Sequence, residues 1–424
     1  MSDSSATKLN VFRNSLPKTN LAFSQAQLNQ AEEQLNSSEF PTTRNEAWKY
    51  TRLAKIANIQ PSISNEQVNS LANNDLGIQV PNVYLVQLFN GKLVDVTDSN
   101  LPEGIVLQPL SACNPEILAD LGKNINSAEV FNSLNTLYAI DGVYIEIPKN
   151  VILDQPIHIQ HIMSGESQVN HIRHYLNAGN SSQSEIILSF QSNSGNSCLN
   201  NVITEARIGE NANLTINKLQ FEGDENFAIC SEQIEQEKYS TFTLNTITLG
   251  GKLIRNNVHT ILNGSYSTCN LNGVYLLKSN QHVDNHTLID HAVPNCESNE
   301  LYKGVMNDNA TGVFNGKVIV RKDAQKTNAF QSNANVLIGS NATINSKPEL
   351  EIYADDVKCS HGSTTGQLDE NAVFYLKSRG ISENAAKQLI VQAFIADVLE
   401  KITNEDVLKV VMEELKNKFN WSVD

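Results

Sequence analysis

The sequence of 424 residues lacks most of the features that mark secreted and membrane proteins. It contains no run of about 18 apolar residues, which is the length that a transmembrane helix needs. Its first residues, Met1 to Asn10, are polar and include no apolar segment of the kind found in a secretory signal. The six cysteines form no Cys-x-x-Cys pair and no tight cluster. We therefore expect a cytoplasmic protein with reduced thiols and no contact with a membrane.

Positive charge is also scarce. The chain has 31 Lys and Arg residues against 46 Asp and Glu residues, which gives a formal net charge of −15. No block of basic residues stands out along the chain. Because phosphate backbones are bound by clustered Lys and Arg side chains, this composition argues against a nucleic-acid partner. An acidic surface instead favours solubility and basic protein partners.

The common nucleotide-binding and catalytic motifs are missing as well. There is no G-x-x-x-x-G-K-[ST] loop for a nucleoside triphosphate and no G-x-G-x-x-G fingerprint for a dinucleotide. The segment Gly362–Gly366 superficially resembles the G-x-S-x-G turn of hydrolases, but its serine is misplaced. Asp355-Asp356 would suit a polysaccharide-cleaving enzyme only with further carboxylates stacked beside it, and the absence of an export signal disfavours that function. We expect no nucleotide site and no stand-alone enzyme.

What the sequence does contain falls into three zones, of which the first, residues 1–83, is expected to be an N-terminal helical region. One helix is expected over Ser24–Leu35, with its first residue as the cap. The segment Thr43–Glu46 has the form of a capping box, in which the first and last side chains bond each other's backbone N–H groups. Trp48, in the helix expected to follow, is predicted to anchor it on the body of the protein.

The middle zone, residues 84–355, is expected to be a core domain built mainly of β-strands. Short runs alternate apolar and polar residues, and Asn, Gly, Asp and Ser separate them at intervals of roughly ten residues. Asn-Gly and Asp-Gly pairs, which mark tight hairpins, are few, so the stacked rungs of a β-helix are favoured and a β-sandwich is the alternative. The clearest strands are expected at Val143–Ile147, Ile186–Phe190, Leu214–Phe221, Thr241–Leu249 and Val336–Ile338.

The last zone, residues 356–424, is expected to be a C-terminal helical domain. A helix over Gln367–Arg379 should end at Gly380, and Ser382 is placed to cap the next one. Apolar stripes usually pack in a core and less often form a docking face for a partner. The second helix has a stripe of Ala386, Leu389, Ile390, Ala393 and Phe394, and the third, starting near Thr403, has Val407, Val411 and Leu415 on one face.

Two groups of His and Cys residues were weighed as metal sites. The first contains His282, His286, His291 and Cys296. On an extended strand His282 and His286 share one face, whereas His291 points to the other. Because a metal ion needs converging ligands, this group is a weak site. Hydrogen bonds from these imidazoles to Asp284, Asp290 or the backbone of a turn are the favoured interpretation.

The second group is Cys359 and His361, whose side chains project to the same side of an extended chain. Thiolate and imidazole both suit iron and other soft or borderline metals. Two ligands are too few for a closed site, so a second chain would have to complete it or the binding would be transient. The residues alone favour a buried cysteine beside a helix-capping histidine. A nucleophilic Cys–His pair is a third alternative, for which no orienting carboxylate is identified.

Several segments are distinctive in combination: Arg44–Thr51, Glu300–Val305, Gly312–Lys317, Asp323–Thr327, Asp355–Gly362, Gly366–Asp369 and Phe374–Ile381. Together they closely resemble the SufD branch of the SufB/SufD family of iron–sulfur cluster assembly scaffolds. The likeness covers nearly the whole chain and is strongest from about Asp284 to Ile381. SufB-like chains usually carry a cysteine where Leu376 stands here and lack the Cys-Ser-His-Gly sequence, so the SufD branch is favoured.

The resemblance implies a right-handed parallel β-helix flanked by helical domains. It also implies a heterodimer with a SufB-like scaffold and a SufC-like ABC-type ATPase docked on the C-terminal helices, so that the partner handles the ATP. On this basis His361, with Cys359 as the second candidate, would contribute to a transient iron or nascent iron–sulfur cluster site shared with SufB. A homodimer of the isolated chain is also compatible with the resemblance. The competing hypothesis is a purely structural adaptor that holds both partners and contributes no ligand.

Overall fold

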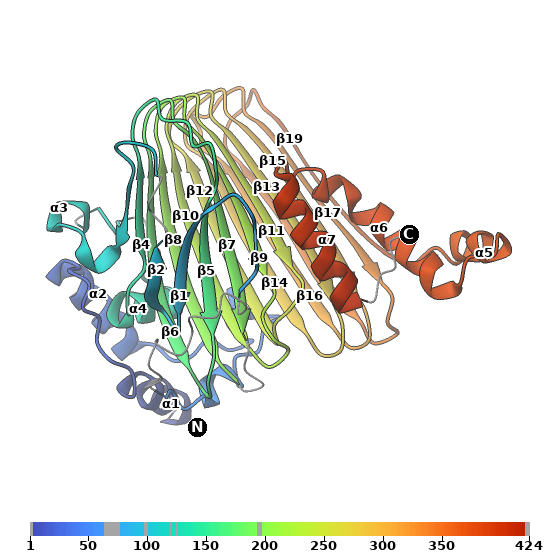
Figure 1. The fold of residues 1–424 in the computed structure, drawn as a ribbon, viewed down its shortest axis with the longest axis horizontal. Helices are drawn as coiled ribbons and strands as arrows, with labels where there is room; N and C mark the ends of the chain where they lie inside the picture. Colours follow the sequence, from blue (N-terminus) through green and yellow to red (C-terminus); the bar gives the residue numbers. More distant parts are fainter. Residues whose placement is uncertain are drawn as a thin grey trace.

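The computed structural model describes residues 3–62, 77–96, 101–118, 120–123, 125–192 and 197–419. Its body is a parallel β-helix made of two sheets, with helices packed against the outer faces (Figure 1). The mainly β fold with helical ends that the sequence predicts is therefore confirmed. The sandwich alternative is wrong, because all neighbouring strands except one terminal pair in each sheet run parallel, and a sandwich of hairpins needs antiparallel pairs.

Successive strands of the helix alternate between the two sheets. The sheets begin with antiparallel pairs. In the first sheet β2 (Lys92–Val96) pairs with β1 (Tyr84–Phe89), and in the second β3 (Val106–Pro109) pairs with β4 (Val143–Ile147). In spatial order, the first sheet contains β19 (Lys358–Gln367), β17 (Asn328–Leu337), β15 (Glu297–Met306), β13 (Thr268–Leu277), β11 (Thr241–Thr248), β9 (Asn213–Gln220), β7 (Gln183–Ser192), β5 (Ile157–Met163), β1 (Tyr84–Phe89) and β2 (Lys92–Val96). The second sheet contains β18 (Thr343–Ile352), β16 (Thr311–Val320), β14 (His282–His291), β12 (Leu253–Leu262), β10 (Phe227–Gln236), β8 (Leu199–Ile208), β6 (Val169–Ala178), β4 (Val143–Ile147) and β3 (Val106–Pro109).

Each strand places alternate side chains inside the helix, and residues in register on neighbouring rungs stack into columns. One inward column contains Phe242, Cys269, Ser298, Ala329 and Cys359. Most of the interior is apolar, which explains why the strand segments are rich in Val, Ile and Leu. All five strand runs expected from the sequence overlap strands: Val143–Ile147 coincides with β4, Ile186–Phe190 lies within β7, and the other three extend one residue past the ends of β9, β11 and β17.

Some of the Asn and Ser residues occupy left-handed positions in the turns between rungs. Ser181, Asn211 and Asn295 occupy the same turn on different rungs and have φ angles of 57°, 58° and 62°. This left-handed region is disfavoured for most L-residues, and Asn tolerates it because its short side chain bonds the local backbone. On these rungs a polar residue adopts the left-handed conformation of the turn, whereas Tyr239 and Tyr266 adopt it on two others.

The N-terminal elements cover the outer face of the second sheet. Leu199, Phe227 and Ile229 of that sheet pack in one apolar cluster with Phe12 and Phe131. The helix expected from Ser24 is confirmed and begins with a capping box between Ser24 and Gln27. The elements are α1 (Asp3–Asn14), α2 (Gln25–Ser37), the short 3₁₀ segments η1 (Glu46–Trp48), η2 (Ile56–Asn58) and η5 (Leu110–Ala112), α3 (Pro115–Leu118) and α4 (Val130–Tyr138).

The capping box predicted at Thr43 and Glu46 is wrong. The segment forms only the short turn η1, and Asn45 makes the local bond by accepting the N–H of Thr42 at 2.8 Å. The carboxylate of Glu46 instead lies 3.0 Å from the ammonium of Lys347, far along the chain. Trp48 is buried in the cluster with the N-terminal helices and the second sheet, so its expected anchoring role is confirmed.

The C-terminal helices α6 (Glu383–Leu399) and α7 (Glu405–Phe419) lie on the outer face of the first sheet (Figure 1). The predicted face of α7 is confirmed, since Val407, Val411 and Leu415 are all buried. The stripe predicted on α6 is wrong in part, because Leu389 is 46% exposed. The buried face of this helix consists of Ala386, Val391, Ile395, Val398 and Leu399. Apolar residues surround most of the helix, so their spacing does not select one face.

Helix α5 (Glu370–Ser378) stands apart from the β-helix (Figure 1). It starts after Asp369, whose carboxylate accepts backbone N–H groups of the first turn, and it is followed by Gly380 with a φ of 89°. It begins later than expected, because β19 continues the β-helix to Gln367. The strand region thus extends past residue 355, where the sequence suggested a boundary. None of the described helices is both long and apolar enough to cross a lipid bilayer.

Candidate functional site

The last rung of the β-helix is open. β18 and β19 are the outermost strands of their sheets, and each has one neighbouring strand in the described part of the chain. Both are ten residues long, and along β19 every side chain except that of Cys359 is exposed. A long edge strand presents a row of backbone N–H and C=O groups that can pair with another chain. The open rung is therefore the natural place for a partner to continue the sheets.

The two edges differ in how well they are protected against pairing. β18 contains Pro348 together with the charged Lys347, Glu349 and Glu351, and such residues block strand addition. β19 has no proline, and Lys358 is its one charged residue. Nothing lies within 4 Å of a Cβ placed on its two glycines, Gly362 and Gly366. β19 is thus the more accessible of the two edges.

Both residues singled out from the sequence lie on this strand. Cys359 and His361 are two positions apart, so they share the face of β19 that points into the open end of the β-helix. Cys359 is half-buried and packs against the apolar interior, in register with Ala329. His361 is exposed, and its neighbour in register on β17 is Gln331. The structure brings the two side chains to the same edge and leaves one side of them open.

The thiol and the imidazole differ in their readiness to bind a metal. Burial raises the pKa of the Cys359 thiol, although a bond with the backbone of Ala329 opposes this effect. Because the thiolate is the metal ligand, Cys359 is the weaker candidate in the isolated chain. The other five cysteines are buried, and burial raises the pKa of Cys269 to about 12. Cys359 is therefore the most accessible thiol of the protein.

Hydrogen bonds across the open rung hold β19 in place. The hydroxyl groups of Ser363 and Ser346 lie 2.8 Å apart, which links β19 to β18. Ser346 also donates to Oδ1 of Asn333 on β17, at 2.8 Å. These bonds fix the strand immediately after His361. The imidazole is consequently carried on an ordered strand and not on a loop.

Sequence reasoning missed two residues beneath His361. Glu300, Gln331 and His361 occupy one inward column on β15, β17 and β19. Glu300 and Gln331 are buried, and Nε2 of Gln331 donates a hydrogen bond of 2.6 Å to Oε2 of Glu300. Their intervals of 31 and 30 residues, obtained from the numbering, are the length of one turn. An interval of about one turn between polar residues could have indicated this column, but only the register of the strands shows which residues stack.

The other His and Cys group does not form a metal site. His282 and His286 flank the buried Asp284 on the outer face of β14, whereas His291 points inward and lies 2.8 Å from the hydroxyl of Ser298. Cys296 is buried beyond the end of that strand and donates to a backbone carbonyl. Within the described ranges, no three His, Cys, Asp or Glu residues are placed to hold a metal ion. The expected aspartate partner is confirmed for His286, which lies 2.9 Å from Asp284, whereas His282 and His291 bond to the hydroxyl groups of Thr51 and Ser298.

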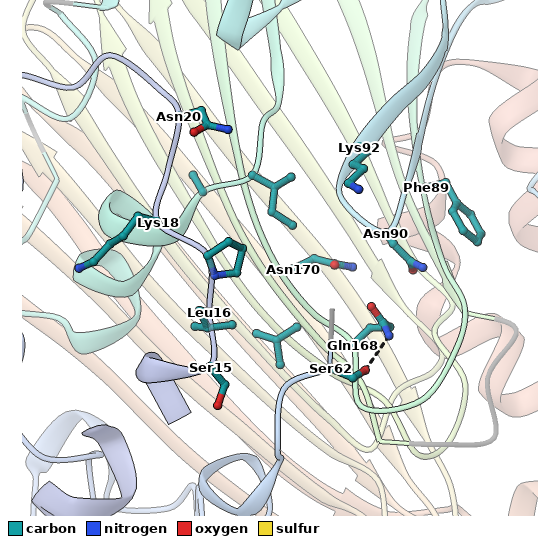
Figure 2. Close-up of a pocket in the computed structure, with 14 residues that line it drawn as sticks. Ser15, Leu16, Lys18, Asn20, Ser62, Phe89, Asn90, Lys92, Gln168 and Asn170 are labelled. Carbon is teal, nitrogen blue, oxygen red and sulfur yellow. Dashed lines mark hydrogen bonds between the residues drawn. The ribbon is translucent and has the colours of Figure 1, made fainter. Parts of the chain in front are cut away.

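A separate cavity of about 280 Å³ lies near the opposite end of the β-helix (Figure 2). Its walls come from the segment around Lys18, from the turn between β1 and β2 with Asn90 and Lys92, and from Asn170 on β6. In Figure 2 the dashed line marks the 2.8 Å hydrogen bond between Gln168 and Ser62. Neither Cys359 nor His361 lines it, so it is not part of the candidate site.

The C-terminal helices present a second surface. Phe374 and Tyr375 on α5 are 73% and 57% exposed, and Leu389 on α6 is also exposed. Exposed aromatic and aliphatic side chains on neighbouring helices are characteristic of protein interaction surfaces. We call these three residues the α5–α6 apolar patch.

Comparison with known proteins adds the family. The family model described as "SUF system FeS cluster assembly, SufBD core domain" matches residues 161–394, and that described as "SufBD protein N-terminal region" matches residues 8–159. The first match contains the column of Glu300, Gln331 and His361. Together the two matches span the N-terminal elements, the β-helix and most of α6.

Three relatives match over most of their length. SufD of Escherichia coli, an iron–sulfur cluster assembly protein, is 31% identical over 388 residues, which cover 90% of each chain. A SufBD family protein of iron–sulfur cluster assembly from Synechocystis is 32% identical over 87% of this chain and 85% of its own. The chloroplastic protein ABCI7 of Arabidopsis thaliana is 30% identical over 88% and 82%. The chain belongs to the SufBD family of iron–sulfur cluster assembly proteins and is a homologue of SufD.

Proposed function

We propose that this chain is a cytoplasmic scaffold subunit that pairs with a SufB-like chain and a SufC-like ABC ATPase to build and release nascent iron–sulfur clusters. It acts as a scaffold and not as an enzyme, and ATP is bound by the partner. The observation that carries the proposal is the coincidence of two features on β19. The strand that lacks a partner at the open edge is also the strand that carries Cys359 and His361.

The SufB-like chain is proposed to add its own strands to this open end. A continued β-helix would satisfy the backbone groups of β19 and cover the apolar interior beneath it. It would also bring further ligands toward His361 and Cys359. Two ligands on one chain bind a cluster weakly, and a weak site suits a scaffold that must pass its cluster on. The iron and the cluster are therefore cargo of a shared, transient site.

The ATPase is proposed to bind the α5–α6 apolar patch. α5 stands away from the β-helix, so a partner has access to Phe374 and Tyr375 without disturbing the packing of α7 (Figure 1). Movement of the docked ATPase would be transmitted through α6, which packs on β13 and β15. β15 lies two places and β13 three places from β19 at the open edge. ATP binding in the partner would in this way act on the cluster site.

The test is cluster formation in the complex. This chain is co-expressed with its SufB-like and SufC-like partners, the complex is reconstituted anaerobically with iron and sulfide, and the cluster absorbance is compared. His361→Ala is expected to reduce the absorbance severalfold and Cys359→Ser to reduce it less. Ser360→Ala, at the neighbouring exposed position whose side chain points outward, is the matched control. If His361→Ala assembles the complex and yields undiminished cluster, the structural adaptor is the correct function.

A further inference from the structure

A buried glutamine, Gln331, lies directly beneath His361. Gln331 is 4% exposed and stands between Glu300 and His361 in the inward column. Its amide nitrogen donates to Glu300 at 2.6 Å, but its Oε1 atom is shielded from solvent and has no hydrogen-bond partner. A buried carbonyl oxygen without a donor is unfavourable, and native proteins seldom leave one unpaired.

The orientation of this amide follows from its surroundings. Nε2 of Gln331 faces Glu300 and donates to its Oε2, so Oε1 of the amide faces away from that hydrogen bond. Across the interior, Gly316 on β16 leaves room for the side chain, since a Cβ there would lie 2.2 Å from Nε2 of Gln331. Phe314, the other inward neighbour on β16, offers no donor. The remaining direction along the column leads to His361.

We propose that Gln331 is a positioning residue for His361: its Oε1 accepts a hydrogen bond from one ring N–H once a partner chain covers the open end. The other ring nitrogen is then deprotonated and points toward the shared site as a ligand. Histidines that bind metals almost always donate their second ring N–H to a carbonyl or carboxylate group, which fixes the tautomer and the ring orientation. Glu300 in turn orients Gln331, because it accepts the hydrogen bond from the amide nitrogen of that residue.

The inference rests on the proposed function, because it assigns a role to residues behind the proposed ligand. The hypothesis of a purely structural adaptor assigns no role to the buried polar residues Glu300 and Gln331. The neighbouring inward column has the apolar Ala329 on the same rung. The column of Gln331 combines a buried carboxyl with an amide that has a free acceptor, and Gly316 lies opposite.

The experiment uses the co-expressed complex with its partners and Co²⁺ as a probe, because its absorption spectrum reports the ligand set. Gln331→Met preserves the length of the side chain and removes the acceptor. It is expected to weaken Co²⁺ binding about tenfold or more and to alter the spectrum. Gln236→Met is the matched control, since Gln236 is equally buried and its Oε1 is also unpaired, but it lies on β10. The control should bind Co²⁺ as the wild type does.

Glu300 provides a second pair of variants in case Gln331→Met folds poorly. Glu300→Gln retains an acceptor for the amide of Gln331 and should preserve Co²⁺ affinity. Glu300→Leu removes that acceptor and should weaken binding as Gln331→Met does. Thermal unfolding of each complex, measured in parallel, separates a loss of positioning from a loss of fold.

A double-mutant comparison tests whether Gln331 acts through His361. In the His361→Ala background, Gln331→Met should have no further effect on Co²⁺ affinity or on the spectrum. An equal, additive loss in both backgrounds would overturn the inference, as would wild-type binding by Gln331→Met when His361→Ala binds weakly. If His361→Ala itself binds Co²⁺ normally, the proposed ligand role fails, and the positioning role fails with it.

Discussion

Arg255 and Asp284 form a buried ion pair, in which Nη1 of the arginine lies 2.7 Å from Oδ2 of the aspartate across the neighbouring strands β12 and β14. The guanidinium group also lies 3.9 Å from the ring centroid of Trp48 and donates to the carbonyl of Ala47 at 2.7 Å. The hydroxyl of Thr51 donates to the same carboxylate. The N-terminal segment is therefore attached to the β-helix through one buried charge.

Removal of that charge is expected to loosen the N-terminal segment. Asp284→Ala leaves the Arg255 guanidinium buried without its partner, and such a change costs about 3–5 kcal/mol of stability. The free energy of unfolding from urea titration measures the loss. Asp356→Ala is the control, because Asp356 pairs with Lys326 on the exposed surface and its loss should leave stability unchanged. Equal stability of both variants would contradict the role of the buried pair.

Proline on the free edge of β19 is expected to prevent pairing with the SufB-like chain. Lys358 donates its N–H toward β17, at 2.9 Å from the carbonyl of Thr327. Because the backbone groups of successive residues in a parallel strand point to opposite sides, the N–H of Thr365 faces the free edge. Thr365→Pro removes this donor and should weaken the heterodimer at least tenfold, as measured by co-purification and equilibrium titration.

Proline at the adjacent residue, Thr364, is expected to affect the stability of the isolated chain. The N–H of Thr364 faces β17, so Thr364→Pro should destabilise β19 in the isolated chain and lower its melting temperature. Thr365→Pro should leave that temperature nearly unchanged, and Thr365→Ala should behave as the wild type in both measurements. A heterodimer that tolerates Thr365→Pro would place the partner elsewhere.

Charged substitutions in the α5–α6 apolar patch should separate docking from folding. Phe374→Asp and Leu389→Asp alter exposed side chains, so stability should change by less than about 0.5 kcal/mol while recovery of the ATPase with the complex falls strongly. Phe394→Asp is the contrast. The ammonium of Lys303 lies 4.8 Å from the ring centroid of Phe394, which packs with the first sheet, and its loss should cost about 1–3 kcal/mol. Normal ATPase recovery by both patch variants would refute the docking surface.

Buried histidines should make the fold sensitive to acid. Desolvation lowers the pKa of His158 to about 3, of His161 to about 4 and of His171 to about 3. The unfolded chain binds protons at these groups near pH 6.5, whereas the folded chain does not. Their contribution to stability is therefore complete above about pH 6.5 and is lost progressively as the pH falls toward 3–4.

His158→Gln isolates one of these groups. Between pH 6.5 and 4.5 the slope of unfolding free energy against pH should decrease by about 1.4 kcal/mol per pH unit relative to the wild type. Glu300 acts in the opposite sense, because burial raises its pKa to about 7 and its contribution is lost as the pH rises through that value. Because Glu300 is present in both proteins, its contribution cancels when the slope of the variant is compared with that of the wild type. An unchanged slope would mean that His158 is accessible to protons in the folded state.

Much of the fold was predictable from local pattern. Alternating apolar runs identified strands, and Asn-rich turns with few hairpin pairs distinguished stacked rungs from a sandwich. The pairing of strands one full turn apart was not predictable, because no strict repeat in the sequence reveals the register. Cys359 and His361 were found because they are neighbours on one strand. Glu300 and Gln331 were missed because their relation to His361 exists only after folding.

The N-terminal motif shows the same limit. Thr43 and Glu46 have local spacing that favours a capping box, but Glu46 interacts instead with Lys347, 301 residues away. Thr51 and Trp48 likewise contact the β-helix through Asp284 and Arg255. The short-range capping rule failed here because Glu46 pairs with the ammonium of Lys347, which is distant in the sequence. On α6, apolar residues on all sides left the choice of the buried face to the sheet beneath.

The two ends of the β-helix are not equivalent. At one end, the short antiparallel strands β2 and β3 finish the sheets, and β3 ends at Pro109. At the other, β19 offers ten residues of unprotected edge. Stacking units with long open edges at both ends can grow into filaments, whereas in the described part of this chain the ten-residue unprotected edge lies at one end. On the proposed function, a copy-to-copy dimer of the free chain through β19 would compete directly with the SufB-like chain for the same strand.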